Sequence, residues 1–272
     1  MLFDSHAHIN NESLSEQERK VMIQEIEASD LDYVMDIGFD LESSNLAVKH
    51  ARKLPWCYAA VGCHPHDTKD MDDMQLAMLK GLAKKEKVQA IGEIGLDFHY
   101  DYSERDTQRH WFRQQIRLAN ELKMPIIIHS READQEVMDI LKEEGAFSEE
   151  RKSWFPLRQD RSGDARVLLH CFSGSKELGE QYVKLGATLS IAGPVTYKNN
   201  RKTVAVVEAV PLENLLVETD SPYLTPEPFR GKKNKPPYVE HTARKVAEIK
   251  GLEFEQVAMR TKENAMRFFG IK

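Results

Sequence analysis

The sequence predicts an α/β fold, a single (β/α)8 TIM barrel that spans residues 1–272. Two observations favour this fold class. Short apolar runs rich in β-branched residues alternate with longer stretches of helical period from one end of the chain to the other, which is typical of parallel βα units. The chain also has 272 residues, close to the roughly 250 residues of one such barrel.

Eight apolar runs are the expected strands. In chain order they are Leu2–His8, Tyr33–Gly38, Tyr58–His64, Val88–Glu93, Pro125–His129, Val167–His170, Ala187–Ile191 and Leu215–Asp220. Stretches of helical period lie between these runs or close the chain: Ser15–Ala28, Met74–Lys84, Asp106–Leu122, Glu132–Lys142, Lys176–Leu185, Val239–Ile249 and Phe254–Phe269. Eight parallel strands with intervening helices favour a closed barrel over an open sheet.

One polar and charged segment, residues 144–166, interrupts this alternation. Because it follows a helix and precedes a strand, we expect an insertion loop at the bottom face of the barrel, away from the chemistry. Trp154 and Phe155 lie in its middle, and they could mark a partner contact. Local packing is the favoured interpretation, since large exposed apolar patches are scarce.

Composition sets limits on function and location. With 41% hydrophobic and 30% charged residues, the chain is typical of a globular protein, and its net charge of -6 argues against a broad basic face for nucleic acid. Cys57, Cys63 and Cys171 have no paired spacing, which fits a reducing compartment. The N-terminus has no secretory signal pattern, and no run of about eighteen apolar residues occurs. We therefore expect a cytoplasmic protein without a membrane span.

Polar residues end most of the expected strands, where parallel barrels carry their catalytic groups. They include five of the ten histidines. The residues are His6, His8, His64, Glu93, His129, His170 and Asp220. A histidine at a strand end is commonly only hydrogen-bonded, but so many clustered polar groups would be costly without a ligand. Imidazole with carboxylate suits Zn, Mn, Fe or Ni, and also Mg, so we expect one or two divalent ions.

Spacing assigns roles to some of these residues. Side chains alternate along a strand, so His6 and His8 point to one side and can bind one ion together. Glu93 emerges from an apolar run, either as a buried ion-pair partner or as a bridge between two metals about 3.5–4 Å apart. Asp220 is expected to be the final ligand and to accept a proton from bound water, and Glu218 to orient a histidine ligand.

A phosphate substrate also needs cations beside the metals. Arg131 and Arg230 are the candidates for substrate binding, since both follow strands at the expected active-site end. Lys233 and Lys235 could bind phosphate or only be solvated. His64 could contact substrate and donate a proton to the leaving oxygen, or serve only as a hydrogen-bond partner. Four aromatic residues could stack on an unpaired base or pack against the wall: Phe98, Tyr100, Phe172 and Tyr223.

Eight strings occur in the order DSHAHIN, VGCHPH, IGEIGLDFHYD, PIIIHSREA, LLHCFSG, LSIAGPVTYKNN, VETDSPYLTP and RGKKNKPPYV. Together, from Phe3 to about Val239, they closely resemble the motifs of the TatD family of metal-dependent hydrolases in the amidohydrolase superfamily. The resemblance implies a TIM barrel with one or two metals and DNase-type phosphodiesterase activity. The long stretch 144–166 and the basic residues Lys233 and Lys235 depart from the family pattern.

The resemblance also implies a ligand set. His6 and His8 resemble ligands of the first metal, His129 and His170 ligands of the second, and Glu93 the bridge between them. Asp220 resembles the ligand that follows the last strand. All six positions are intact in this sequence.

Three functions follow as hypotheses. The first is a nuclease that uses metal-activated water to cleave phosphodiester bonds, acting on single-stranded DNA or RNA ends, with Asp220, Glu93 and His64 as catalytic residues. The alternative is a carbonyl-centre hydrolase, such as a D-aminoacyl-tRNA deacylase or an amidohydrolase, because the same chemistry attacks carbon. The third is a metal-binding scaffold without turnover, which the complete ligand set disfavours. The sequence leaves the identity of any protein partner unknown.

Overall fold

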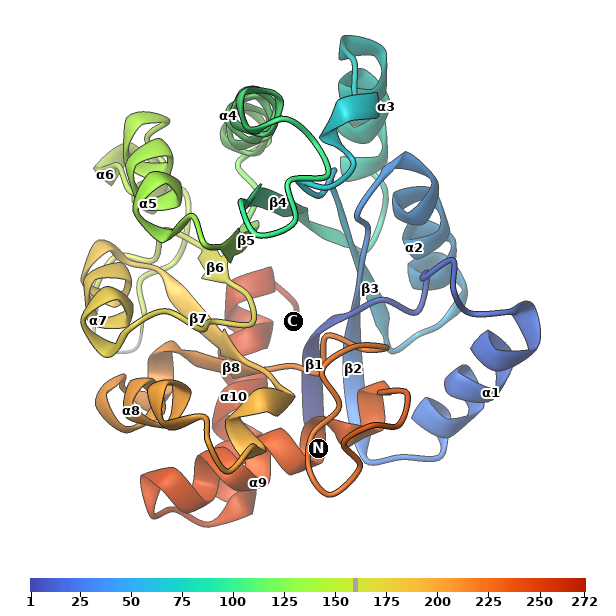
Figure 1. Cartoon of the computed structure of the whole chain (residues 1–272), viewed down its shortest axis with the longest axis vertical. Helices are drawn as coiled ribbons and strands as arrows, with labels where there is room; N and C mark the ends of the chain where they lie inside the picture. The colour runs from blue at the N-terminus through green and yellow to red at the C-terminus, as the bar shows by residue number, and fades with distance from the viewer. Residues whose placement is uncertain (159–160) are drawn as a thin grey trace.

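The computed structural model describes residues 1–158 and 161–272. In these residues eight parallel strands form one sheet in the order β1 to β8, with helices outside it (Figure 1). The strands are β1 (Leu2–Ala7), β2 (Leu31–Ile37), β3 (Cys57–Val61), β4 (Val88–Asp97), β5 (Ile126–Arg131), β6 (Val167–Leu169), β7 (Thr188–Ile191) and β8 (Leu215–Val217). The prediction of a single-domain TIM barrel is confirmed.

The barrel closes where the first strand meets the segment that follows the last. Ala7 forms a parallel bridge with Ser221. The amide of His8 donates to the carbonyl of Ser221 (2.8 Å), and the amide of Asp220 donates to the carbonyl of His6 (2.9 Å). These bonds fix the backbone of His6 beside that of Asp220, although the two residues are far apart in the chain.

The helices form an outer ring. They are α1 (Glu16–Glu27), α2 (Leu41–Lys53), α3 (Asp73–Ala83), α4 (Arg105–Leu122), α5 (Asp134–Glu143), α6 (Glu149–Ser153), α7 (Lys176–Leu185), α8 (Arg201–Ala209), α9 (Val239–Lys250) and α10 (Phe254–Phe269). Several begin at residues whose side chain accepts a backbone amide of the first turn, such as Ser15 before α1 and Ser175 before α7. Among the described residues, no helix is both long and apolar enough to cross a membrane.

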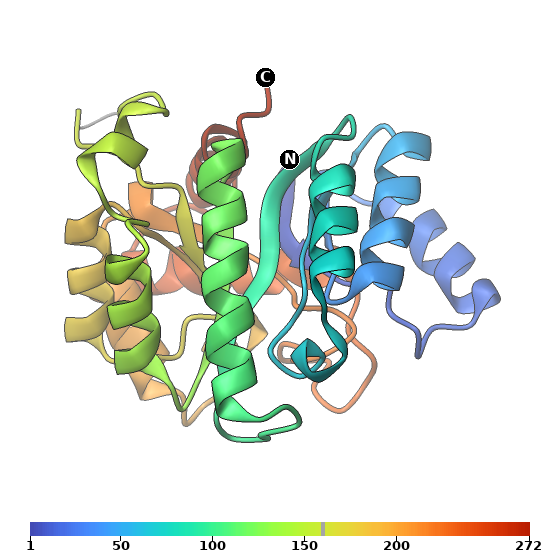
Figure 2. The ribbon, with the colours of Figure 1, turned by 90° about the horizontal axis from the view of Figure 1, so that it is seen from above.

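Apolar side chains fill the barrel interior, and α10 covers its N-terminal end. Phe3, Ile37, Ile127 and Leu168 belong to one buried cluster that also contains Phe269 of α10. Figure 2 shows both chain ends on this side and the loops after β4 and β8 on the opposite side. The C-terminal ends of the strands lie on the opposite side from α10, and Figure 1 looks into that end of the barrel.

Strand β4 is longer than the sequence predicts. The expected strand ends at Glu93, whereas β4 continues to Asp97 because it pairs with β5 as far as Arg131. The backbone of β5 approaches closely here, and a side chain at Gly95 would overlap the carbonyl oxygen of His129. Glycine at this position therefore lets the two strands run side by side, which brings Glu93 and His129 together.

Strands β3, β6 and β8 are shorter than expected. They end at Val61, Leu169 and Val217, so His64 and Asp220 lie in the loops that follow rather than on strands. Alternation along a strand therefore does not decide where these side chains point. Helices α2 and α8, which are absent from the expected set, complete the ring.

The described part of segment 144–166 contacts the N-terminal ends of two strands. Arg151 of α6 is fully buried and donates to the carbonyl oxygens of Met124 and Ala165, both at 2.8 Å. These residues precede β5 and β6, on the side of the barrel opposite to the loops after β4 and β8. Residues 159–160 of this segment lie outside the described residues.

Candidate metal centre

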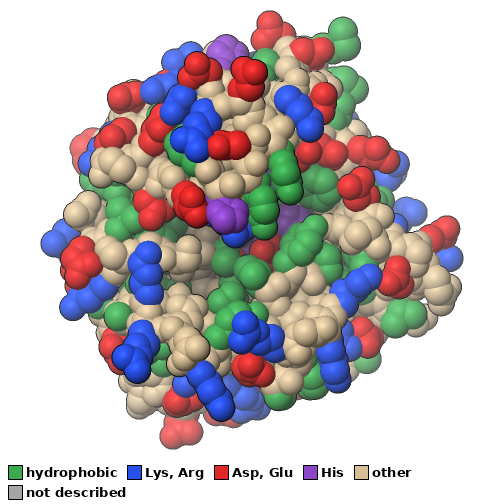
Figure 3. Space-filling view, in the orientation of Figure 1, with side chains coloured by type: hydrophobic (Ala, Val, Ile, Leu, Met, Phe, Trp, Pro, Cys, Tyr) green, Lys and Arg blue, Asp and Glu red, His purple; other side chains and the backbone are tan. Residues whose placement is uncertain are grey.

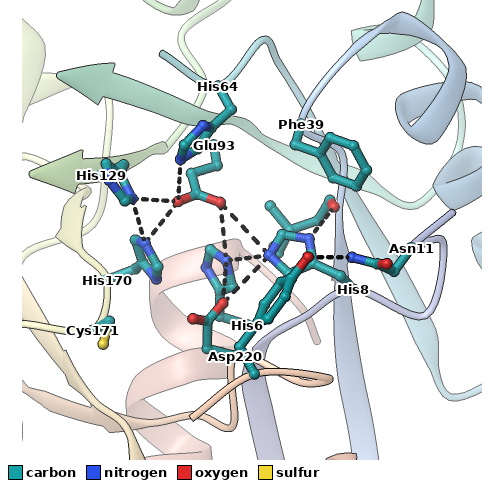
Figure 4. Close-up of polar contacts among 12 residues, drawn as sticks. His6, His8, Asn11, Phe39, His64, Glu93, His129, His170, Cys171 and Asp220 are labelled. Atoms are coloured by element: carbon teal, nitrogen blue, oxygen red, sulfur yellow. Dashed lines mark hydrogen bonds and ion pairs between the residues drawn. The ribbon is translucent and has the colours of Figure 1, made fainter. Parts of the chain in front are cut away.

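The structure brings together all of the residues expected to bind metal, at the C-terminal end of the barrel. They come from five different strands or the loops after them, and they surround the carboxylate of Glu93, which is 3% exposed (Figure 4). The residues are His6, His8, Glu93, His129, His170 and Asp220. Their assignment as ligands stays a prediction, and the geometry below supports it.

One oxygen of Glu93 faces the first pair of histidines. Its Oε2 lies 3.3 Å from Nε2 of His6 and 3.7 Å from Nε2 of His8. The Oδ1 atom of Asp220 completes this group, at 3.7 Å and 3.4 Å from the same two nitrogens. The nitrogens themselves are 3.2 Å apart, close to the separation of about 3.3 Å for two imidazoles bound to one tetrahedral ion.

The other carboxylate oxygen of Glu93 faces a second pair of histidines. Its Oε1 lies 2.9 Å from Nδ1 of His129 and 2.7 Å from Nε2 of His170. These two nitrogens are 3.4 Å apart. The two oxygens of one buried carboxylate therefore point into two separate groups of donors, as Figure 4 shows.

The outward nitrogens of these histidines indicate which tautomer each ring adopts. In three of the four rings the nitrogen that points away from the group lies against an acceptor, so it carries the N–H and the inward nitrogen presents a lone pair. The pairs are His8 with the carbonyl of Ile37 (2.9 Å), His129 with Asp97 (3.2 Å) and His170 with Glu218 (3.3 Å). Imidazole lone pairs and carboxylate oxygens that face one another repel unless a positive charge lies between them. A set of nitrogen and oxygen donors suits a divalent transition metal.

The fourth ring, His6, is held differently. Its Nδ1 is buried and has no hydrogen-bond partner among the described residues, while the ring stacks on that of His170 with centroids 3.9 Å apart. Asp4, at the same side of β1, anchors the strand by accepting the amide (2.9 Å) and hydroxyl (2.5 Å) of Thr219. The position of His6 is thus fixed by its backbone and by stacking.

The electrostatics of the group agree with a site for cations. Burial alone would raise the pKa of Glu93, but the neighbouring His170 and His64 outweigh burial and hold it well below its usual range. Burial alone would lower the pKa of His170, yet the charges of Glu93 and Glu218 raise it well above the usual value. The carboxylates of this group therefore attract positive charge into the space between them and the imidazoles.

His64 lies beside the second group but directs its N–H inward. Its Nε2 is 3.6 Å from Oε1 of Glu93, whereas its Nδ1 accepts the backbone amide of His66 at 3.2 Å. Burial and the neighbouring His129 lower the pKa of His64 well below its usual value, so the ring is neutral. A neutral ring whose Nδ1 accepts carries its proton on Nε2, and it therefore offers a donor toward Glu93.

Sequence reasoning did not assign a role to Asp97. This buried carboxylate lies 3.2 Å from Nε2 of His129 and 2.8 Å from Nε2 of His66, so it orients both rings. Asp97 follows Glu93 at an even spacing on β4, and that spacing is the signal by which it could have been found. Glu218, expected to orient a histidine, lies 3.3 Å from Nδ1 of His170.

The two expected substrate cations occupy the surrounding surface. Arg131 ends β5 and is exposed, with its guanidinium 4.6 Å from the ring of Tyr100. Arg230 is also exposed and lies 4.2 Å from the ring of Tyr197, beside a pocket of about 470 Å³. Figure 3 views this end of the molecule and shows histidine side chains near its centre, with hydrophobic side chains beside them and several Lys and Arg side chains on the surrounding surface.

The lysines of the loop after β8 have acidic partners. Lys233 lies 2.7 Å from Glu18, and Lys235 lies 2.6 Å from Glu25. Both glutamates belong to α1, so the two ion pairs connect the loop to that helix. Arg230 is therefore the better candidate for binding phosphate in this loop.

The fold and the site together define a class, the (β/α)8 hydrolases that depend on bound divalent metal. Comparison with known proteins narrows this class. The family profile described as TatD related DNase matches residues 3–270, and the chain belongs to this family of metal-dependent hydrolases.

Named relatives agree with this family. A Bacillus subtilis protein named uncharacterized metal-dependent hydrolase YabD is 44% identical over 271 residues, covering 100% of both chains. A Cronobacter sakazakii protein named 3'-5' ssDNA/RNA exonuclease TatD is 31% identical over 273 residues, covering 98% of this chain and 97% of its own. The crystal structure of YJJV, a TatD homolog from Escherichia coli K12, superposes with a TM-score of 0.86 at 26% identity, covering 100% of this chain and 98% of that one.

Proposed function

We propose that this protein is a nuclease that hydrolyses phosphodiester bonds with the help of one or two divalent ions, and that it acts on single-stranded ends of DNA or RNA. The observation that carries the proposal is the position of Glu93, whose two oxygens face two separate donor groups 2.7 to 3.7 Å away. Two adjacent ions are suited to in-line displacement at phosphorus. The name of the Cronobacter relative supports the same substrate class.

The residues present fit such ions. His6, His8 and Asp220 would hold one, His129 and His170 a second, and Glu93 would contact both. When bound, divalent ions polarise a phosphoryl oxygen and lower the pKa of water so that it is nucleophilic near neutral pH.

The chain's own groups perform the proton transfers in this proposal. Asp220 is partly exposed at the mouth of the group and its Oδ1 faces His6 and His8, so it can orient the attacking water and accept its proton. His64 offers an Nε2–H that can donate to the leaving oxygen. Arg131 and Arg230, both exposed on this end of the barrel, can contact flanking phosphates.

The test compares phosphodiester and carbonyl substrates. Purified protein, stripped with chelator and reloaded separately with Mn²⁺, Zn²⁺, Mg²⁺, Ni²⁺ or Fe²⁺, is incubated with end-labelled single-stranded DNA and RNA and with panels of esters, amides and D-aminoacyl-tRNA. We expect shortened labelled products that disappear with chelator and in Glu93→Ala. Glu86→Ala is the matched control, because Glu86 is exposed and precedes the opposite end of the same strand. Turnover of the carbonyl panels alone would establish the alternative function.

Salt dependence provides a second test. Contacts to several phosphates release counterions, so cleavage of a long strand should slow steeply between low and moderate salt. Arg131→Ala and Arg230→Ala should each flatten that dependence. If the cleavage rate of the wild type does not change with salt concentration, the substrate is a small molecule rather than a long strand.

A further inference from the structure

Two tyrosines lie stacked on the surface next to the metal centre. Tyr100 and Tyr102 belong to the loop between β4 and α4, and their ring centroids are 5.2 Å apart with planes 19° from parallel. Their exposed fractions are 44% and 58%. Aromatic rings of a globular protein normally bury their faces, so an exposed stacked pair indicates a binding surface.

Three other aromatic candidates lie near this end. Phe98 and Phe172 are packed, whereas Tyr223 is 53% exposed and is not stacked, since its ring meets that of His8 edge to face with centroids 6.3 Å apart. Phe172 is buried in the main core, and Phe98 is packed against that core. The guanidinium groups of Arg105 and Arg109 lie 4.4 Å and 5.3 Å from the ring of Phe98. Among these rings, only Tyr100 and Tyr102 are both stacked and largely exposed. Packing against the protein accounts for the positions of the two phenylalanines but not for those of the tyrosines.

The pair is connected to the metal centre through His66. The ring of His66 lies 5.4 Å from that of Tyr100 and 4.8 Å from that of Tyr102, with its edge toward both. Its Nε2 is 2.8 Å from Asp97, the same carboxylate that holds His129. A group stacked on the tyrosines would therefore lie beside the second donor group, within the reach of one nucleotide.

A cation completes the surface. The exposed guanidinium of Arg131 lies 4.6 Å from the ring of Tyr100. An aromatic face next to a fixed positive charge matches an unpaired nucleotide, which offers a flat base and a phosphate a few ångströms apart. A base inside a duplex cannot use such a surface, because neighbouring base pairs cover both of its faces.

We propose that Tyr100 and Tyr102 form a stacking platform for an unpaired base next to the scissile phosphate, with Arg131 contacting the adjoining phosphate. This inference rests on the proposed nuclease function and deepens it, because it names the residues that select single-stranded over double-stranded nucleic acid. It is independent of sequence, since every base has a face that can stack.

Binding to chelated, metal-free protein tests the platform without cleavage. Fluorescence anisotropy measures the Kd of a labelled eight-residue oligothymidylate for the wild type, Tyr100→Ala and Tyr102→Ala. We expect each alanine variant to bind on the order of tenfold more weakly, as for other stacked bases. Tyr102→Phe, which keeps the ring, should bind like the wild type. Met259→Ala on α10 is the control, because Met259 is 54% exposed and α10 covers the opposite end of the barrel.

A strand of the same length built from abasic residues separates stacking from a structural effect on His66. The wild type should bind this strand more weakly than oligothymidylate, and the tyrosine variants should match the wild type on it. If the tyrosine substitutions weaken binding of the abasic strand as much as binding of oligothymidylate, the inference is wrong. Tyrosine variants that bind oligothymidylate as tightly as the wild type would also overturn it, and so would a wild type that does not bind oligothymidylate.

Cleavage then distinguishes this inference from the function on which it rests. Metal-loaded wild type should prefer single strands over a blunt duplex, and Tyr102→Ala should lose most of that preference. If the wild type cleaves DNA and the variant keeps the preference, the platform is wrong and the nuclease stands. If the loaded wild type cleaves no phosphodiester, the proposed function itself fails.

Discussion

At the scale of single residues, the partner of each outward nitrogen determines what a histidine in this centre can do. His8, His129 and His170 donate outward to acceptors, so their inward nitrogens are free to bind a cation. His64 accepts outward from a backbone amide, so its inward nitrogen carries a proton. The histidines around Glu93 are thus divided into expected metal ligands and one expected proton donor by hydrogen bonds on the outward side of each ring.

This sorting predicts different losses for His64→Ala and His129→Ala. His64→Ala should keep its metal content and lose about 10²- to 10⁴-fold in kcat, since a positioned proton donor contributes about that much. His129→Ala should lose bound metal. Elemental analysis of the reloaded proteins, together with steady-state rates, measures both. Depletion of metal in the His64 variant would contradict its role as a donor.

Asp97→Asn should weaken metal binding without unfolding the protein. An amide can present its NH₂ group where His129 needs an acceptor, and loss of an orienting carboxylate typically reduces metal affinity about 10- to 100-fold. Isothermal titration with Mn²⁺ or Zn²⁺ measures the change. Asp101→Asn, an exposed aspartate of the same loop that pairs with Arg105, is the control and should titrate like the wild type.

At the scale of elements, α6 is attached to the barrel by a charged side chain inside the protein. The guanidinium of Arg151 bonds to carbonyl oxygens next to β5 and β6, and the rings of Trp154 and Phe155 lie 5.8 Å and 5.5 Å from it. Burial and then the nearby Arg166 lower the pKa of Arg151 to about 9, so it remains charged at neutral pH. Neutral oxygens and aromatic faces thus stabilise this cation.

Arg151→Met should destabilise the fold and spare the chemistry. The substitution leaves the carbonyl oxygens of Met124 and Ala165 buried without their donor, which should lower the free energy of unfolding by about 3 kcal/mol. Urea denaturation measures the loss, with Glu150→Met on the exposed side of α6 as the control. The folded variant should retain the wild-type kcat. A folded variant with reduced kcat would contradict our expectation that segment 144–166 lies away from the chemistry.

The loop after β3 predicts a pH-dependent contribution to stability. Burial, and next the charge of Asp40, raise the pKa of Asp67 to about 6 from an ordinary value of 3.8. The folded state therefore binds a proton that the unfolded chain has released, and this contribution, complete below about pH 4, is lost as pH rises through 6. Asp67→Asn should remove that part of the slope between pH 4 and 7 in urea denaturation. Asp30→Asn, an exposed control, should leave the slope unchanged.

At the scale of the whole molecule, the sequence was sufficient for the architecture and for most of the centre. In a barrel the C-terminal ends of all strands meet, so polar residues after separate apolar runs had to converge. The sequence alone does not give the distance between side chains on neighbouring strands. Asp97 was missed for this reason, because its role is visible only from its contact with His129. Helix α2 was missed because small residues such as Ser44 and Ala47 occupy its buried face, which weakens the apolar period.

Metal should stabilise the entire barrel, because its expected ligands come from strands all around the ring. At an ion concentration about 100-fold above Kd, binding adds about 2.7 kcal/mol to the free energy of unfolding, roughly 5–10 °C in Tm for a chain of this size. Differential scanning fluorimetry of chelated and reloaded protein measures this shift. Glu93→Gln should lose most of it, whereas Glu86→Gln should respond like the wild type. Equal Tm with and without metal in the wild type would contradict a ligand set that spans the ring.

The bridge between Ala7 and Ser221 has a consequence for how the protein is made. Translation delivers His6 and His8 with the first strand, but Asp220 leaves the ribosome only after all eight strands have been synthesised. A product that terminates before Ser221 carries most of the donors and cannot join the first strand to the last. We therefore expect prematurely terminated chains to be unable to acquire the ion that His6 and His8 are predicted to bind, so that incomplete copies of this protein are released without hydrolytic activity.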